Sequence, residues 1–182
     1  MAFTFQKLTI SGLVLIEGKK YQDDRGFFKE TYKKSEFEAA GITEDFVQDN
    51  YSISQRGVVR GLHYQLSPHA QGKLVQVVGG RAWDVAVDIR KDSETFGQWF
   101  GVELSEDDNK FFYIPPGFAH GFQALTDDVQ FMYKCTSEYD QATERSIRYD
   151  DPDLAVDWPI KTDMLVAPKD AGAPFLKDAQ TF

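Results

Sequence analysis

The stretch Arg81-Ala-Trp-Asp-Val-Ala-Val-Asp-Ile-Arg90 decides the fold class, because its apolar and polar side chains alternate. In an extended strand, successive side chains point to opposite faces, so Val85 and Val87 share one face. Asp84 and Asp88 share the other face. The period of two over this length predicts a β-strand with one apolar face and one polar face.

The rest of the chain contains similar short runs that are rich in β-branched and aromatic residues. Turn signals such as Gly79-Gly80 and Pro115-Pro116-Gly117 separate them. The further runs are Leu13–Ile16, Phe27–Tyr32, Val47–Ser54, Val58–Gln65, Lys73–Val78, Gln98–Glu103, Phe111–Ile114, Gly121–Leu125 and Val129–Lys134. Together they predict about ten strands in an all-β fold, either a jelly roll or a barrel.

One short helix is predicted among the strands. Ser35 can cap its N-terminus, Glu38 follows as a capping-box partner, and Gly41 can end it. Beyond Asp150 the sequence is rich in Pro and Asp, which predicts loops and short helices packed on the barrel. Such a tail can reach the mouth of a binding cavity.

The composition indicates a folded protein. Hydrophobic residues make up 42% and aromatic residues 14% of the 182 residues, which excludes a disordered chain and predicts one domain over residues 1–182. Twenty basic against 29 acidic residues give a net charge of -9. This charge repels polyanions, so we expect no nucleic-acid partner. An anionic ligand would need locally concentrated basic side chains.

Several other classes of protein are disfavoured. Residues 1–7 lack a signal-peptide layout and the apolar run 13–16 is too short to cross a bilayer, so we expect a cytoplasmic protein without membrane contact. The single cysteine, Cys135, cannot form an internal disulfide and is interpreted as a buried filler. Walker, Gly-x-Gly-x-x-Gly and Gly-x-Ser-x-Gly patterns are absent, which argues against a phosphate loop, a Rossmann site and a serine hydrolase.

The chain has only three histidines, His63, His69 and His120, so few residues are candidates for histidine-dependent chemistry. His69 lies in an evident loop and is interpreted as solvated surface. His63 and Gln65 alternate along one strand, so both can face the inside of a barrel. Taken alone, however, a strand histidine is more often a core residue than a catalytic one.

Three further polar residues become interesting only through their neighbours. Arg60 can face the same side as His63 if the strand carries a bulge near Gly61. Lys73 begins a strand and would by itself be a surface residue. Tyr133 alternates with apolar neighbours and would by itself be a core aromatic.

Six segments, taken in order, point to a known family. They are Asp24-Arg-Gly-Phe-Phe-Lys-Glu30, Phe46-Val-Gln-Asp-Asn50, Val59-Arg-Gly-Leu-His-Tyr-Gln65, Gln71-Gly-Lys-Leu-Val75, Trp83-Asp-Val-Ala-Val-Asp-Ile-Arg90 and Pro116-Gly-Phe-Ala-His-Gly-Phe122. With them the chain resembles the bacterial dTDP-4-dehydrorhamnose 3,5-epimerases. The resemblance implies a cupin-type double-stranded β-helix, that is, a jelly-roll barrel with a few short peripheral helices. It also implies a homodimer that acts on a dTDP-linked 4-keto-6-deoxy sugar.

The resemblance also assigns roles to residues. His63 matches the base, Asp170 the residue that orients it, Tyr133 the proton donor and Lys73 a group near the C4 oxygen of the sugar. Positions that match substrate contacts are Arg25, Glu30, Gln48, Asn50, Arg60, His120, Glu144 and Lys169, and Tyr139 matches an aromatic that stacks on the thymine. Arg25, Arg60 and Lys169 would supply the positive charge that a diphosphate needs.

Metal and cofactor are not expected. Cupins commonly bind a metal through a His-x-His pair, a following carboxylate and a later histidine. In this chain Gln65 stands in place of the second histidine of the pair, and the run after it supplies no glutamate ligand. His63 and His120 remain, and two histidines rarely suffice for a catalytic metal.

The implied reaction explains why these groups are needed. In a 4-keto-6-deoxyglucose ring, carbons 3 and 5 both flank the ketone, so either proton can leave if an enolate forms. One base can serve both carbons, and inversion requires that the new proton arrive from the opposite face. A neutral imidazole can accept the proton, a phenol can donate one, and Lys73 can stabilise the enolate oxygen.

Three alternatives remain open on the sequence alone. The first is an enzyme of the same family that inverts carbon 3 or carbon 5 only. The second is a metal-dependent cupin isomerase or oxygenase that uses His63, Gln65 and His120. The third is a module that binds a sugar nucleotide without turnover, since arginines and stacking aromatics suffice for binding.

Overall fold

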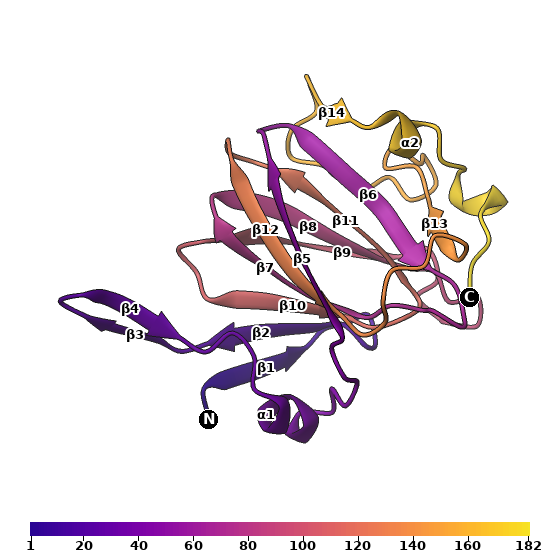
Figure 1. The fold of residues 1–182 in the computed structure, drawn as a ribbon. Helices are drawn as coiled ribbons and strands as arrows, with labels where there is room; N and C mark the ends of the chain where they lie inside the picture. Colours follow the sequence, from indigo (N-terminus) through magenta and orange to yellow (C-terminus); the bar gives the residue numbers. More distant parts are fainter.

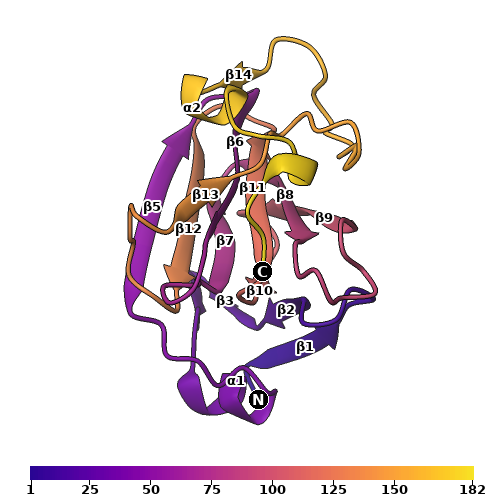
Figure 2. The ribbon, with the colours of Figure 1, turned by 90° about the vertical axis from the view of Figure 1, so that its right-hand side faces the viewer.

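Two β-sheets face each other in the computed structural model, which describes residues 1–182 (Figures 1 and 2). The first sheet contains, in spatial order, β1 (Phe3–Lys7), β2 (Val14–Gly18), β10 (Lys110–Ile114), β7 (Lys73–Gly79), β12 (Val129–Cys135) and β5 (Gln48–Ser54). The second contains β13 (Glu144–Ser146), β6 (Val58–Gln65), β11 (Phe118–Ala124), β8 (Arg81–Asp88) and β9 (Trp99–Ser105). Neighbours on these two paths pair antiparallel, so the predicted all-β, jelly-roll type of fold is confirmed. That residues 1–182 form one domain stays a prediction.

The main core lies between the two sheets. Phe122 of β11 and Phe131 of β12 stack with ring centroids 4.1 Å apart, which joins one sheet to the other. Smaller side chains such as Ala82 and Ala86 of β8 belong to the same buried cluster. Removing these apolar surfaces from water is the main force that holds the sheets together.

Strand β8 uses its two faces as the alternation predicts. Val85 and Val87 point away from the partner sheet and pack in a second buried cluster with Leu154 and Trp158 of the tail. The opposite face, which carries Asp84, looks between the sheets. The polar face of this strand is therefore the inner one.

The predicted helix exists, but its start differs from the prediction. Helix α1 spans Lys34–Ala39, its N-cap is Lys33, and no side chain caps it. Ser35 thus lies inside the helix, and the expected capping box is wrong. The Oε2 atom of Glu36 instead accepts the backbone N–H of Ala2 at 2.8 Å, so the acidic first turn binds the N-terminal strand. Gly41 follows the helix end with φ +93, as the C-terminal signal predicts.

A hairpin projects from the body of the molecule (Figure 1). It consists of β3 (Lys20–Asp23) and β4 (Gly26–Lys29), which pair with each other and with no other strand. Phe27 and Phe28 are 53% and 66% exposed. The strand predicted over 27–32 thus begins one residue earlier and ends at Lys29. Strand β3 was not predicted, because its sequence Lys-Tyr-Gln-Asp is exposed on both faces and carries no apolar alternation.

The tail beyond residue 150 crosses the outer face of the second sheet and returns to its upper edge (Figures 1 and 2). The Gln123 side chain donates to the Ile160 carbonyl at 2.8 Å and accepts the Ile160 N–H at 2.8 Å, which fixes the first part of the tail. Farther along lie β14 (Leu165–Val166), α2 (Pro168–Ala171) and the short 3-10 helix Leu176–Asp178. β14 pairs in parallel with β6. The predicted loops and short helices are confirmed.

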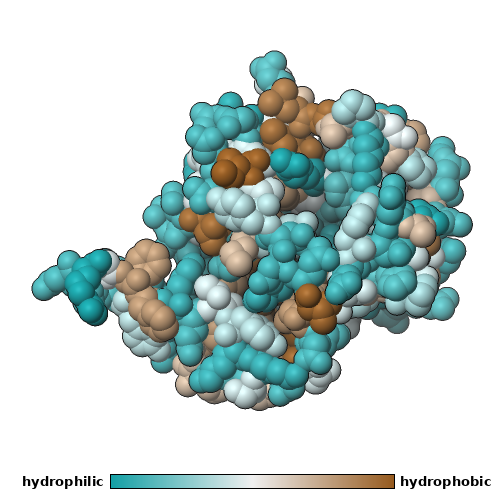
Figure 3. Space-filling model, viewed as in Figure 1, coloured by the Kyte–Doolittle hydropathy of each residue, from teal (hydrophilic) through white to brown (hydrophobic).

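No helix of the protein is both long enough and apolar enough to span a membrane. Viewed on the face of Figure 3, the surface is largely hydrophilic. Apolar colour gathers near the upper edge, around β14 and the start of β6, and again on the projecting hairpin (Figure 3). The upper edge is where the main cavity opens.

Candidate active site

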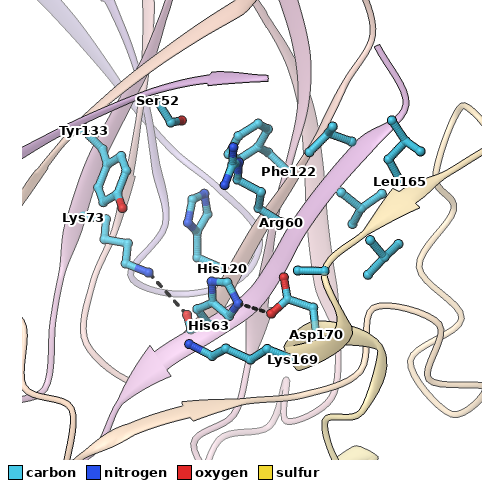
Figure 4. A pocket seen from close by; sticks show the side chains of 14 residues that line it. Ser52, Arg60, His63, Lys73, His120, Phe122, Tyr133, Leu165, Lys169 and Asp170 are labelled. Carbon is cyan, nitrogen blue, oxygen red and sulfur yellow. Dashed lines mark hydrogen bonds and ion pairs between the residues drawn. The ribbon is translucent and has the colours of Figure 1, made fainter. Parts of the chain in front are cut away.

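A cavity of about 630 Å³ opens between the sheets, at the end covered by the tail (Figure 4). One wall carries apolar residues of β6 and β14, including Val58, Val59 and Leu165. Its ionisable side chains are Arg60, His63, Lys73, His120, Tyr133, Lys169 and Asp170. All seven belong to the set that the family resemblance singled out, so the fold brings distant parts of the sequence to one place.

A bulge in β6 lets Arg60 and His63 face the same cavity. His63 pairs with His120 and Arg60 with Phe122, so three steps along β6 match two steps along β11. The extra residue lies at Gly61, whose φ of +136 is unfavourable for any residue with a Cβ. A Cβ there would also lie 2.5 Å from the Cα of Gly121. The predicted bulge is confirmed.

The cavity wall formed by β6 holds a histidine–aspartate pair. The Nε2 atom of His63 lies 2.6 Å from Oδ1 of Asp170, which comes from α2 in the tail. The other oxygen of Asp170 accepts the N–H of Gly61 at 3.3 Å. Burial would raise the pKa of Asp170, but the hydrogen bond and charge interaction with His63, the Gly61 N–H and the charge of Lys169 together outweigh it and hold the pKa below the ordinary value. An ionised Asp170 can orient the imidazole and stabilise its protonated form.

A second histidine–aspartate pair lies deeper in the cavity. The Nε2 atom of His120 is 2.9 Å from Oδ2 of Asp84, and Asp84 is completely buried. Its second oxygen, Oδ1, has no hydrogen-bond partner. Burial lowers the pKa of His120 although Asp84 opposes the shift. The sequence prediction missed Asp84, and the available signal was its place on the polar face of the alternating strand.

The facing wall supplies Lys73 from β7 and Tyr133 from β12 (Figure 4). Lys73 is only 8% exposed, and its Nζ donates to the backbone carbonyl of His63 at 3.3 Å. Burial lowers the pKa of the Lys73 ammonium. Burial also raises the pKa of Tyr133 to about 12, so this phenol keeps its proton at neutral pH. The Tyr133 phenol and the His63–Asp170 pair thus lie on opposite walls of the cavity.

A smaller recess of about 160 Å³ shares His63, Lys73 and Tyr133 with the main cavity and extends it outward to Tyr139 and Glu144. Glu144 connects two other side chains at the outer rim of this recess. Its carboxylate accepts from the Tyr139 hydroxyl at 3.1 Å and from Lys169 Nζ at 2.6 Å. Polar and aromatic groups therefore line a path from the lumen to the surface.

Gln48 and Asn50 lie on β5, close to this rim. Gln48 donates to Asn50 Oδ1 at 3.0 Å and accepts the Tyr139 N–H at 2.7 Å. Asn50 also donates to the Cys135 sulfur at 3.4 Å. Cys135 is buried, in agreement with its interpretation as a filler.

The residues do not fit the metal site that is common among cupins. Gln65, at the position of the second ligand, donates to the carbonyls of His69 and Glu138 at 2.7 and 3.1 Å and accepts the N–H of Asp140 at 2.8 Å. The Nε2 atoms of His63 and His120 each face a carboxylate instead of a common point. No group of three or more His, Cys, Asp or Glu side chains is arranged to hold a metal ion.

Two predicted substrate contacts lie away from the cavity of their own chain. Arg25 sits at the hairpin turn, where its side chain is 89% exposed and pairs with Asp23 at 2.5 Å. Glu30 follows β4 and lines neither cavity. Arg60, by contrast, is in the cavity, with its Nε donating to the Ser54 hydroxyl at 3.0 Å. The roles of Arg25 and Glu30 stay predictions.

A lumen with ionisable side chains on both walls suits an enzyme that moves protons on a small substrate, and the isomerases with a cupin-type jelly roll are such enzymes. Comparison with known proteins narrows this class. The chain belongs to the dTDP-4-dehydrorhamnose 3,5-epimerase family, because the sequence model of that family matches residues 7–178. The predicted family, cupin-type fold and isomerase class are thereby confirmed.

Individual relatives are similar over nearly their whole length. A dTDP-4-dehydrorhamnose 3,5-epimerase of Methanothermobacter thermautotrophicus is 47% identical over 92% of this chain and 91% of its own. The crystal structure of a dTDP-6-deoxy-D-glucose-3,5-epimerase from Legionella pneumophila, in complex with dTDP-4-keto-L-rhamnose, superimposes with a TM-score of 0.94. It is 50% identical, and the match covers 98% of this chain and 95% of that one.

A 3′-monoepimerase from Streptomyces bikiniensis, solved in complex with dTDP-quinovose, has the same fold. Its TM-score is 0.89 at 36% identity, over 94% of this chain and 87% of that one. Inversion of one carbon and inversion of two carbons therefore occur on one architecture. The fold by itself does not separate the two activities.

Proposed function

We propose that this epimerase converts dTDP-4-dehydro-6-deoxy-D-glucose to dTDP-4-dehydro-L-rhamnose, with His63 as the base and Tyr133 as the acid. The observation that carries the proposal is their placement. His63, paired with Asp170, lies on the second sheet, whereas the protonated Tyr133 lies on the first sheet across the lumen. A sugar ring held between the sheets would present one face to each residue.

Each inversion then consists of two proton transfers. The imidazole of His63 removes the proton from the carbon next to the ketone, the C–H electrons form the enolate, and Asp170 stabilises the imidazolium. The enolate collapses back to the ketone as its carbon takes the Tyr133 proton from the opposite face. His63 is left protonated and Tyr133 ionised, so both must exchange protons with water before the second carbon reacts. No redox change occurs.

The enolate oxygen needs positive charge or hydrogen-bond donors. Lys73 is buried in the wall between His63 and Tyr133 and can supply both. His120, held by Asp84, lines the same cavity and can bind the sugar. Preorganised donors of this kind act strongly when they are buried, as Lys73 and His120 are.

The nucleotide would occupy the outer part of the site. Arg60 and Lys169 offer positive charge to the diphosphate despite the acidic composition of the chain. Tyr139 is 55% exposed at the rim and offers its ring to the thymine, beside Gln48, Asn50 and Glu144. The Legionella relative was solved with a dTDP-sugar, which supports this class of ligand.

We also propose that the protein is a homodimer. Arg25 and Glu30 can reach a substrate only in the cavity of a second copy, because their own hairpin points away from the body (Figure 1). The hairpin also exposes Phe27 and Phe28, whose apolar surface would be buried in such an assembly.

Incubation of dTDP-4-keto-6-deoxyglucose with the protein in deuterated water, after treatment with a chelator, tests the reaction. We expect deuterium at carbons 3 and 5, with both configurations inverted, as measured by NMR. Deuterium at only one of the two carbons would indicate an epimerase that inverts a single centre. Binding of the sugar nucleotide without any deuterium incorporation would indicate a module that binds its ligand without turnover. Loss of activity that added metal restores would select the metal-dependent alternative.

A further inference from the structure

The rim segment Ser137–Asp140, which carries Tyr139, has an unusual set of partners. Four of its backbone groups are bound by glutamine side chains instead of by a neighbouring strand. The contacts are Gln71 Nε2 to the Ser137 carbonyl at 2.7 Å, Gln65 Nε2 to the Glu138 carbonyl at 3.1 Å, the Tyr139 N–H to Gln48 Oε1 at 2.7 Å and the Asp140 N–H to Gln65 Oε1 at 2.8 Å. We call Gln48, Gln65 and Gln71 the glutamine bracket.

Gln65 is the central member of the bracket. It is 3% exposed, and its amide also donates to the His69 carbonyl at 2.7 Å, so it ties two loops to β6. The contacts require a donor and an acceptor on the same planar group, which is what a primary amide offers. An apolar side chain at this position would leave buried backbone groups unpaired, at a cost typical of lost hydrogen bonds.

The bracket fixes a backbone whose one large side chain faces the recess. Tyr139 is held by its own N–H, and its hydroxyl donates to Glu144 at 3.1 Å. Its ring therefore stays half exposed at the rim without support from a regular strand. A flat aromatic surface that is fixed before binding loses less conformational entropy when a ring stacks on it.

We propose that Gln65, with Gln48 and Gln71, is a positioning residue for nucleotide recognition. It acts through Tyr139 by fixing the segment Ser137–Asp140, and it takes no part in proton transfer. The same inward position that could have carried a metal-binding histidine thus orders the nucleoside subsite. The inference rests on the proposed function, in which Tyr139 stacks on the thymine.

A double-mutant cycle on the full-length protein tests the inference. The variants are Gln65→Met, Tyr139→Ala and the double variant, with dTDP affinity measured by calorimetry and kcat at saturating sugar nucleotide by NMR. Gln76→Met is the matched control, because Gln76 is also buried and its Oε1 has no hydrogen-bond partner. Gln71→Met removes a single hydrogen bond of the bracket, and it replaces Gln65→Met as the test variant if Gln65→Met does not fold.

The base-stacking contribution sets the expected size of the effect. Tyr139→Ala and Gln65→Met should each weaken dTDP binding about 10-fold, and kcat should stay within about twofold. Adding Gln65→Met to Tyr139→Ala should change dTDP affinity less than about twofold, because the two residues act in series. Gln71→Met should weaken dTDP binding in the same direction, by less, and Gln76→Met should leave dTDP affinity unchanged.

Two results would overturn the inference. One is wild-type dTDP affinity in Gln65→Met or, if that variant does not fold, in Gln71→Met. The other is an equal further loss of affinity in the Tyr139→Ala background, which would mean that Gln65 acts on the fold in general. Unchanged dTDP affinity in Tyr139→Ala would instead reject the stacking role in the proposed function, so the two failures are separate observations.

Discussion

The imidazole Nε2 of His63 lies 2.6 Å from Oδ1 of Asp170, although 107 positions separate the two residues in the chain. His63 is on a barrel strand and Asp170 is on a short helix of the tail. The pair exists only when the tail is docked on the second sheet. Under the proposed function, docking of the tail is therefore a condition for a working base.

Asp170→Asn should lower kcat by about 10²- to 10⁴-fold, the range for loss of general base function, because an amide cannot stabilise the imidazolium. The affinity for dTDP should stay near the wild-type value, because the nucleotide contacts lie elsewhere. Turnover by NMR and calorimetry with dTDP measure the two effects. Asp178→Asn, at an exposed position of the same tail, is the control. Wild-type turnover of Asp170→Asn would contradict the role of the pair.

Tyr133→Phe should separate exchange from inversion. His63 can still remove a proton and return one to the same face, so deuterium should enter from heavy water while the configuration is retained. NMR of the sugar recovered after incubation measures label and configuration together. His63→Asn should abolish both. A Tyr133→Phe variant that inverts at the wild-type rate would exclude Tyr133 as the acid.

Lys73→Met should reduce kcat by about 10²- to 10³-fold, the usual effect of losing one donor to a developing oxyanion. Because burial lowers the pKa of Lys73, the wild-type enzyme should lose activity with rising pH before a free lysine would titrate. Tyr133, with a pKa of about 12, does not cause this loss. A pH profile of kcat for both proteins checks the assignment, since the alkaline fall should be missing in Lys73→Met.

Asp88 should make the protein sensitive to acid. Burial would raise the pKa of this carboxyl, but hydrogen bonds from Arg90, Ser93 and Thr95 lower it to about 2. A lowered pKa stabilises the fold above the unfolded value near 4 and loses that contribution as pH falls toward 2, a change of about 2 kcal/mol. Urea unfolding at pH 7 and pH 3 should show that the stability gap between wild type and Asp88→Asn narrows in acid. A constant gap would contradict this linkage.

The dimer proposal predicts complementation. Arg25→Ala and His63→Asn should each be nearly inactive as pure homodimers. If Arg25 reaches the cavity of the partner, a dimer mixed from the two variants has one complete site, so activity should return to about a quarter of wild type at random equal mixing. Turnover after joint refolding, with sedimentation to measure the oligomer, provides the test. Mixed dimers without activity would mean that Arg25 acts in the cavity of its own chain, and an active Arg25→Ala homodimer would place Arg25 outside the substrate site.

Much of the fold could be predicted because its signals are local. The alternation around Val85 and Asp84 follows from the geometry of a strand. The bulge at Gly61 could be predicted because Arg60 and His63 are three residues apart and face the same side of a strand only if it carries an extra residue. The hairpin strand β3 and the true start of α1 were missed. The hairpin has no buried face, and the helix is anchored by Glu36 to a distant backbone instead of by its own cap.

By itself, the sequence determined the all-β class, the polar and apolar faces of β8, the family and the residue types of the site. The family resemblance predicted that Asp170 orients His63, and the structure gives that pair its distance of 2.6 Å. Only the tertiary structure decided that the inner face of β8 is the polar one, that Asp84 meets His120, and that Gln65 binds the rim segment instead of a metal. The physical reason is that strand periodicity is set by neighbours along the chain. Register between strands and the docking of the tail depend on packing between residues that are far apart in sequence.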